Sequence, residues 1–180
     1  MGAPKPLLRW NGAPLVRWHA LALQARCGAV RVVAGAHAVG IRAALVGLHP
    51  AAVVVDHPRW AATDMAGSAL RGLRGVDPRS LVIVTPVDAA PAPAWVLDRL
   101  RAAADPHGAV GTRGGRDGHP LIARVGLLLD TLRAGGTLRA AVEALPRVEV
   151  AWPDLHRNLN TPGDWAAWLG EMGSPSPPAG

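Results

Sequence analysis

Several polar residues of this sequence stand at expected strand ends or helix starts, where α/β proteins place ligand chemistry. Asp88 follows the apolar, β-branched run 81–85, which is typical of a strand buried on both faces of a parallel sheet. A carboxylate there can hold Mg²⁺, which takes one or two carboxylates together with phosphate oxygens and water. The alternative is that Asp88 only turns the chain or caps the helix that follows Pro91.

Two other positions have the chemistry of anion binding. Lys5 is the only lysine of the chain, and its ammonium suits phosphate charge, although it could equally be a solvated side chain. Gly67 and Ser68 begin an expected helix, where backbone N–H groups and the helix dipole favour an anion. The alternative for this pair is a simple helix cap.

His119, within Gly-His-Pro, and Asn160, within Asn-Leu-Asn-Thr-Pro, are the remaining candidates. Taken alone, His119 suits a hydrogen bond within a loop, and Asn160 suits a turn or a helix cap. The sequence contains no His and Cys cluster with zinc spacing, and neither GxSxG nor GxxxxGK[ST]. Zinc chemistry, a nucleophile elbow and a Walker-type phosphate loop are therefore not indicated.

The elements that must position these residues alternate between strand and helix, which predicts an α/β fold with a parallel sheet and helices on both faces. One domain is expected over 1–172, and the Pro- and Ser-rich tail 173–180 is expected to be disordered. The segment 113–120, RGGRDGHP, is expected to be a mobile glycine-rich loop. Strands are predicted at 31–34, 51–55, 81–85, 109–112 and 148–151, and helices at 14–28, 38–48, 93–104, 121–133, 138–145 and 163–172. The segment 63–71 is expected to be a polar, glycine-containing turn that opens a further helix, which ends at about residue 74.

Composition argues against two classes of partner. The net charge is +6, but the eighteen arginines are scattered and there is no Tyr or Phe to stack bases, so nucleic-acid binding is not expected. No apolar run is long enough to span a bilayer, and no signal peptide is recognisable. The single cysteine, Cys27, suits a reducing compartment, so a cytoplasmic location is expected.

The order of the motifs resembles the MobA-like NTP transferase family, and within it most closely the molybdenum cofactor cytidylyltransferase branch. The family pattern runs LAAGxSxRMGxPKxLL, GMGSSLRAGL, a strand ending in DxP, a GHP loop and a terminal DI[DN]TPED. Here the corresponding stretches are MGAPKPLL (1–8), DMAGSALRGL (64–73), VDAAP (87–91), GHP (118–120) and NLNTPGD (158–164).

The resemblance implies a Rossmann-like three-layer αβα fold with a mostly parallel sheet. It implies Mg²⁺-dependent transfer of CMP from CTP (or GMP from GTP) to a phosphorylated acceptor such as molybdopterin, with release of pyrophosphate. A molybdoenzyme or its chaperone is the implied protein partner. By position, Lys5 and Asp88 would be catalytic, Asp88 and Asn160 would bind the metal, and Gly118 and His119 would form an acceptor-side loop. The nucleotide would contact Gly2, Lys5, Gly67 and Ser68.

The family's LAAGxSxR loop and its first strand have no counterpart, because they would precede Met1. Two explanations follow: a start site set within the RMGxPK motif, which we favour, or an inactive homologue. The second gives the alternative of a protein that binds or delivers the cofactor without catalysis. A nucleotidyltransferase with a sugar-phosphate acceptor is a further alternative. A missing central strand would leave its two neighbours with unpaired edges.

Overall fold

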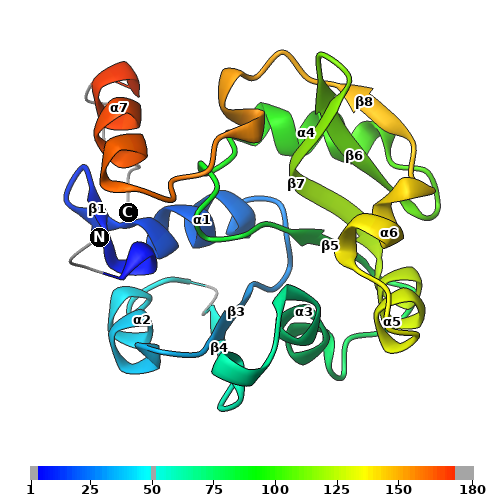
Figure 1. The fold of residues 1–180 in the computed structure, drawn as a ribbon, viewed down its shortest axis with the longest axis horizontal. Coiled ribbons are helices and arrows are strands. Elements are labelled where there is room, and N and C mark those ends of the chain that lie inside the picture. The colour runs from blue at the N-terminus through cyan, green and yellow to red at the C-terminus, as the bar shows by residue number, and fades with distance from the viewer. Residues whose placement is uncertain (1–3, 50–51, 173–180) are drawn as a thin grey trace.

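Helices alternate with strands along most of the chain in a computed structural model that describes residues 4–49 and 52–172 (Figure 1). The α-helices are α1 (Leu15–Gln24), α2 (Ala38–Ala44), α3 (Met65–Leu73), α4 (Ala94–Ala103), α5 (Val125–Arg133), α6 (Leu138–Glu143) and α7 (Pro162–Met172). The strands are β1 (Arg9–Trp10), β2 (Ala13–Pro14), β3 (Arg31–Ala34), β4 (Val53–Asp56), β5 (Leu81–Val84), β6 (Gly108–Arg113), β7 (Arg116–Arg124) and β8 (Arg147–Glu149). Short 3₁₀ turns are η1 (Lys5–Leu7), η2 (Trp60–Ala62) and η3 (Pro153–His156).

The main sheet has four strands in the order β5-β7-β6-β8. β7 runs antiparallel to both of its neighbours, and β8 is parallel to β6, so every strand except β7 points the same way. β3 and β4 form a separate parallel pair, and β1 and β2 a small antiparallel hairpin. The predicted α/β class with mostly parallel strands is confirmed, with one reversed strand inside the main sheet.

Side chains on alternate positions of the main sheet enter two different cores, as strand periodicity requires. Ile83 and Ile122 pack with residues of α1, α4 and α7 on one face. Val82, Leu121 and Ala123 pack with residues of α3, α5 and α6 on the other. The sheet is therefore the middle layer of three, which is the predicted αβα arrangement.

Among the described strands, β3 pairs only with β4 and β5 only with β7, so each has a strand partner on one edge only. The prediction that 81–85 is buried on both faces was wrong in degree: Leu81 is 46% exposed and Val82–Val84 are half-buried. A β-branched run is shielded on all sides only when strands flank it on both edges, and β5 has one such neighbour.

The segment 113–120 is ordered into a β-hairpin, so the prediction of a mobile loop was wrong. Arg113 pairs with Arg116 across a two-residue turn, and Gly114 and Gly115 have φ of +58° and +74°. Two successive positive φ values define the turn that matches strand twist, and glycine adopts them without strain. The prediction of helix from 121 was likewise wrong for 121–124, which complete β7, and α5 begins at Val125.

The remaining elements agree with the predictions to within a few residues; the largest differences are α1, which ends at Gln24 instead of residue 28, and α2, which ends at Ala44 instead of residue 48. Gly2 and the tail 173–180 lie outside the described residues. In the described part of the chain, none of the helices has the length and apolar character needed to cross a membrane.

Candidate functional site

Three of the predicted site residues come together at one point of the structure. The ammonium of Lys5 donates to Asp88 Oδ2 at 3.0 Å and to Asn160 Oδ1 at 2.6 Å. Lys5 is separated by 83 residues from Asp88 and by 155 from Asn160, so only the tertiary fold brings them together. The side chains of Lys5 and Asp88 are 34% and 30% exposed, so this cluster is open to a ligand from solution.

The backbone fixes Asp88 and Asn160 relative to each other. The chain after β5 and the chain after η3 form an isolated antiparallel bridge between Ala89 and Asn158. On one side of it, the N–H of Leu159 donates to the carbonyl of Asp88 at 2.6 Å. The Leu159 side chain is completely buried in the core formed with α4 and α7. The residues whose side-chain oxygens contact Lys5, Asp88 and Asn160, therefore lie on two backbone segments that are hydrogen-bonded to each other and anchored in the core.

A capping arrangement at the start of α7 holds Asn160 from its other side. Asp164 Oδ2 accepts from the N–H of Asn160 at 3.1 Å and of Thr161 at 2.8 Å, and Thr161 Oγ1 accepts from the N–H of Asp164. This is the reciprocal capping box, here with Asp in the acidic position. The hydrogen bonds from Thr161 lower the pKa of Asp164, so it caps as a carboxylate at neutral pH.

Lys5 is carried by the short turn η1, which is anchored by the leucines that follow it. Leu7 packs onto the core between α1 and α2, close against Gly40, where an added Cβ would lie 2.8 Å from Leu7 Cδ1. The carbonyl of Leu8 accepts from the N–H of Leu15 at the start of α1. The turn is thus fixed on α1 and α2, while the flexible stem of Lys5 extends from it.

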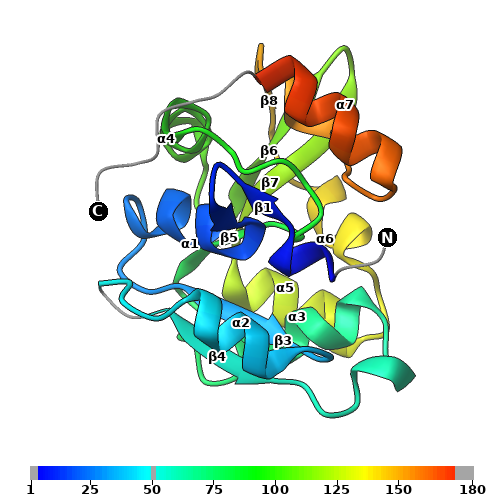
Figure 2. The same ribbon diagram turned by 90° about the vertical axis from the view of Figure 1, so that its left-hand side faces the viewer.

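Tryptophan packing joins the N-terminal and C-terminal parts that carry Lys5 and Asn160. The ring of Trp10, in β1, lies 4.6 Å from that of Trp18 and 4.6 Å from that of Trp168, measured between centroids. Figure 2 shows β1 and α1 lying between α7 and α2. This contact sets α7, and with it the segment that precedes it, against the start of the chain.

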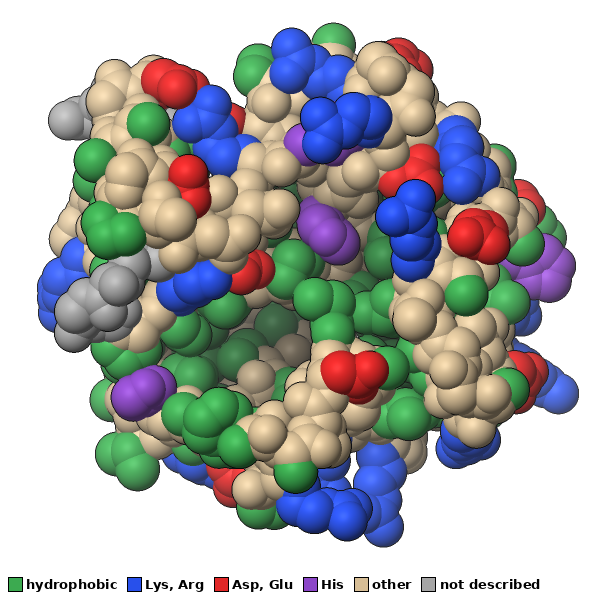
Figure 3. Space-filling view, viewed as in Figure 1, with side chains coloured by type: hydrophobic (Ala, Val, Ile, Leu, Met, Phe, Trp, Pro, Cys, Tyr) green, Lys and Arg blue, Asp and Glu red, His purple; other side chains and the backbone are tan. Residues whose placement is uncertain are grey.

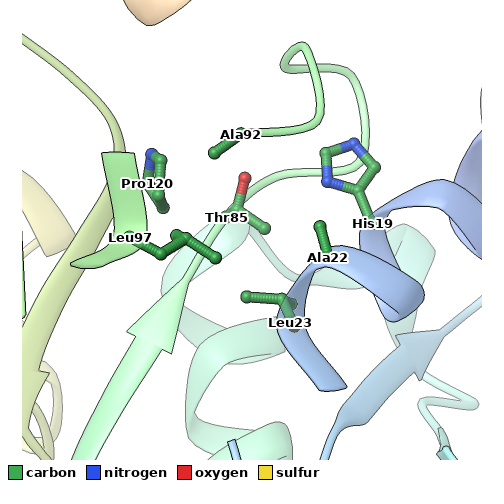
Figure 4. Close-up of a pocket in the computed structure, with 7 residues that line it drawn as sticks. All are labelled: His19, Ala22, Leu23, Thr85, Ala92, Leu97 and Pro120. Carbon is green, nitrogen blue, oxygen red and sulfur yellow. The ribbon is translucent and has the colours of Figure 1, made fainter. Parts of the chain in front are cut away.

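His19, in α1, hydrogen-bonds to the loop that carries Asp88. It is 7% exposed, and its Nε2 lies 3.0 Å from the carbonyl of Ala89, so Nε2–H is the donor. In Figure 4 the imidazole points from α1 toward this loop, near Thr85 at the end of β5. The adjoining cavity is about 10 Å³, at the lower limit for one water molecule, so it is not a substrate pocket. His19 is a positioning residue.

Burial lowers the pKa of His19 to about 4, against partial opposition from the carbonyls of Ala89 and Val87 and the charge of Asp88. Because the unfolded chain binds this proton more readily, the free energy of unfolding should fall as pH drops from about 6.5 to about 4, by up to about 3 kcal/mol. His19→Gln, which keeps an N–H donor but cannot titrate, should lack this component in urea unfolding measured between pH 7 and pH 4. His107→Gln, at an exposed position, is the control and should retain it. Parallel pH profiles for wild type and His19→Gln would contradict the assignment.

His119 lies beside the same loop, just past the end of β5. Val84 pairs with Leu121, so His119 and Pro120 extend beyond the last paired residue of β5. Burial lowers the pKa of His119, with Asp88 acting in the opposite sense and His156 in the same sense. Its Nδ1 is buried and has no hydrogen-bond partner among the described residues. The imidazole is therefore neutral at pH 7, and it lies close enough to Asp88 to be affected by the charge of that carboxylate.

Gly118 has a packing role that its motif did not reveal. A Cβ added here would lie 2.4 Å from the carbonyl oxygen of Leu155 and 3.0 Å from Nδ1 of His156. The glycine lets η3 approach β7 closely, which brings His156 near His119. His156 is itself held by an Nε2 hydrogen bond to the carbonyl of Arg113 at 3.1 Å.

Gly67 and Ser68 lie in the first turn of α3, and both of their N–H groups have partners. Asp64, the residue before the helix, accepts from the N–H of Gly67 through Oδ1 at 3.0 Å and from that of Ser68 through its carbonyl at 3.2 Å. This is the capped helix start given above as the alternative to an anion site. A contact to nucleotide would therefore have to come from the Ser68 side chain or from other atoms of this turn.

The donor set around Lys5 fits a hard divalent cation. A carboxylate oxygen and an amide oxygen already converge on one positive group, and both are ligands that Mg²⁺ and Mn²⁺ accept. Within 4–49 and 52–172, no cluster of three or more His, Cys, Asp or Glu side chains is arranged to hold a metal. A cation held by Asp88 and Asn160 would have to complete its coordination shell with phosphate oxygens and water. Figure 3 shows a recess between α2 and α3 with a hydrophobic floor and charged and histidine side chains at its rim.

Sequence reasoning missed His19, Asp64 and His156. His19 lies on a helix face that is otherwise apolar, and only its burial under the Asp88 loop gives it a role. His156 is brought to the site by the close approach at Gly118, for which the sequence offers no local signal. Asp64 could have been found from its position three residues before Gly67, which is a usual capping distance.

Solved structures with the same fold are similar to this chain over nearly their whole length. Rv0371c from Mycobacterium tuberculosis H37Rv is 20% identical, with a TM-score of 0.76 over 94% of this chain and 91% of that chain. A structure of Rv0371c in complex with manganese is 21% identical, with a TM-score of 0.74 over 93% and 91%. A 4-diphosphocytidyl-2C-methyl-D-erythritol synthase is 17% identical, with a TM-score of 0.66 over 94% of both chains.

No curated protein sequence matches this chain significantly. The sequence profile of the MobA-like NTP transferase domain, in contrast, matches residues 1–149, which include η1 with Lys5, α3, the Asp88 loop and the β6–β7 hairpin. The chain belongs to the MobA-like NTP transferase domain family.

Proposed function

We propose that this protein transfers CMP from CTP to a phosphorylated acceptor, the molybdopterin cofactor, in a reaction that depends on a divalent cation. The observation that carries the proposal is the convergence of Lys5, Asp88 and Asn160 at one point. These are a phosphate-binding cation and two oxygen ligands for a metal, contributed by three separate motifs. The manganese in the Rv0371c structure and the cytidylyl chemistry named for the synthase support the same assignment.

The reaction needs positioning and charge stabilisation and no covalent enzyme intermediate. A phosphate oxygen of the acceptor forms a bond to the α-phosphorus of the nucleotide, and the bond from that phosphorus to the bridging oxygen breaks. Pyrophosphate leaves with the electron pair. Asp88 and Asn160 would hold the cation, which when bound offsets negative charge on the phosphates. Lys5 would contact the phosphates directly.

The other predicted residues have more peripheral parts in this proposal. Gly2, Gly67 and Ser68 would contact the nucleotide, with Ser68 using its hydroxyl because the N–H groups of this turn are capped. Gly118 and His119 would form the acceptor side, where the neutral imidazole of His119 offers a hydrogen bond next to Asp88. The protein would act in the cytoplasm and hand its product to a molybdoenzyme or its chaperone.

Release of pyrophosphate from each of CTP, GTP, ATP and UTP tests the proposal directly. The purified protein is incubated with Mg²⁺, molybdopterin and each nucleotide in turn, and the pyrophosphate released is measured. With each nucleotide labelled in its base, the labelled acceptor product is then separated from the free nucleotide. We expect transfer from CTP to exceed transfer from the other three by at least tenfold, because a site that hydrogen-bonds one base leaves polar groups unpaired with another. A glucose 1-phosphate arm tests the sugar-phosphate acceptor. No pyrophosphate from any nucleotide and acceptor would refute the proposal.

A further inference from the structure

The ammonium of Lys5 occupies the point on which the two proposed metal ligands converge. It lies 3.0 Å from Asp88 Oδ2 and 2.6 Å from Asn160 Oδ1, which are direct hydrogen bonds. A divalent cation would need the lone pairs of the same oxygens at a shorter distance, about 2.0–2.1 Å for Mg²⁺. The two positive groups cannot share this position, because their charges repel and the oxygens are already engaged.

Lys5 is the member of the cluster that can move. Asp88 and Asn160 are fixed by the bridge between Ala89 and Asn158 and by the capping box at α7. Lys5 is anchored only through its backbone turn, and its four-carbon side chain is 34% exposed. Its ammonium can therefore leave the two oxygens by rotation of the side chain, without any change in the fold.

We propose that Lys5 competes with the divalent cation, so that the cation binds to Asp88 and Asn160 only when phosphate groups draw the ammonium away. In the absence of nucleotide, Lys5 neutralises Asp88 and keeps the affinity for free metal low. A triphosphate offers Lys5 a stronger anionic partner, and the metal enters with the nucleotide. The role of the triphosphate rests on the proposed function, whereas the competition between Lys5 and metal does not.

Binding of Mn²⁺ alone tests the competition without any catalysis. Lys5→Gln keeps a polar side chain but removes the charge, and we expect it to bind free Mn²⁺ on the order of tenfold more tightly than wild type. The free Mn²⁺ signal in electron paramagnetic resonance measures the affinity. Lys5→Arg retains the charge and should stay within about threefold of wild type. Arg9→Gln, which removes an exposed positive charge from the same N-terminal segment, is the matched control and should leave the affinity unchanged.

A second measurement follows the lysine itself. Because Lys5 is the only lysine of the chain, protein labelled with ¹³C,¹⁵N-lysine gives a single side-chain Nζ signal that needs no assignment. We expect CTP with Mg²⁺ to shift this signal and Mg²⁺ alone, at the same concentration, to leave it in place. The shift should be absent for AMP, which has no triphosphate.

Two results would overturn the proposal. One is a Lys5→Gln variant that binds Mn²⁺ no more tightly than wild type, or whose gain persists when Asp88→Asn is added, since the metal would then bind elsewhere. The other is a lysine signal that shifts with Mg²⁺ alone. Failure of the proposed function has a different signature: Mn²⁺ affinity would rise in Lys5→Gln, yet no nucleotide would release pyrophosphate.

Discussion

Asp88→Asn should lower the rate of the proposed metal-dependent nucleotidyl transfer by about 10³-fold, the largest effect expected of any single change in this site. The amide keeps the shape of the side chain but removes the charged oxygen that would hold the proposed metal, and it leaves the Lys5 ammonium without its counter-charge. Mn²⁺ affinity should fall with the rate. The thermal midpoint should change little, because an ion pair this exposed contributes at most about 1 kcal/mol.

Asp98→Asn is the matched control for this variant. Asp98 also forms an ion pair, with Arg26 at 2.5 Å, but it lies on the exposed side of α4 and is not part of the candidate site. We expect its rate and its Mn²⁺ affinity to equal those of wild type. An Asp88→Asn protein that retained more than a tenth of the wild-type rate at saturating Mg²⁺ would show that Asp88 is not a ligand of the reacting metal.

Gly118→Ala should destabilise the protein by about 2–3 kcal/mol, because the new methyl group meets atoms that cannot yield. The Cβ would stand 2.4 Å from the carbonyl oxygen of Leu155 and 2.5 Å from Cγ of the same residue, whose side chain is 1% exposed. Relief requires η3 to move away from β7. The segment that follows η3 carries Asn160, so the Mn²⁺ affinity of the folded protein should also fall.

Urea unfolding gives the stability, and Mn²⁺ titration of the folded protein gives the effect on the site. Gly28→Ala provides the comparison, since no atom lies within 4 Å of a Cβ at that position and its φ is not positive. Its free energy of unfolding should stay within about 1 kcal/mol of wild type. If Gly118→Ala matched Gly28→Ala in both measurements, the close approach of β7 and η3 would not be needed for the site.

Strands and helices were predicted correctly from the sequence wherever their own residues contain the necessary pattern. The run Arg31–Ala34 forms β3 with the predicted bounds, and Pro162 begins α7 as a proline in the first helical turn does. A helix start at Gly67 and Ser68 was also predicted, and α3 begins at Met65, although its cap, Asp64, was missed. These features depend on residues a few positions apart.

For the segment 113–124, prediction from the local sequence gave the wrong secondary structure. Its RGGR stretch resembles a loop, and the apolar residues after it fit a helix as well as a strand, since a short apolar run does not distinguish the two. These apolar residues form a strand, β7, because it pairs with β5 on one edge and with β6 on the other. Backbone hydrogen bonds to strands formed from residues 81–84 and 108–113 supply the stabilisation, and no local pattern contains that information.

The α/β class, the family and the position of Asp88 after a strand follow from the amino-acid sequence alone, because each depends on periodicity or on the order of short motifs. Three contacts could be found only from the folded structure: the hydrogen bonds of Lys5 to Asp88 and Asn160, the buried packing of His19 against the Asp88 loop, and the close approach of η3 to Gly118. These contacts join residues from 37 to 155 positions apart. They form because packed cores and paired backbones fix the segments in space. The spacing of two residues along the chain does not encode the distance between them in the folded protein.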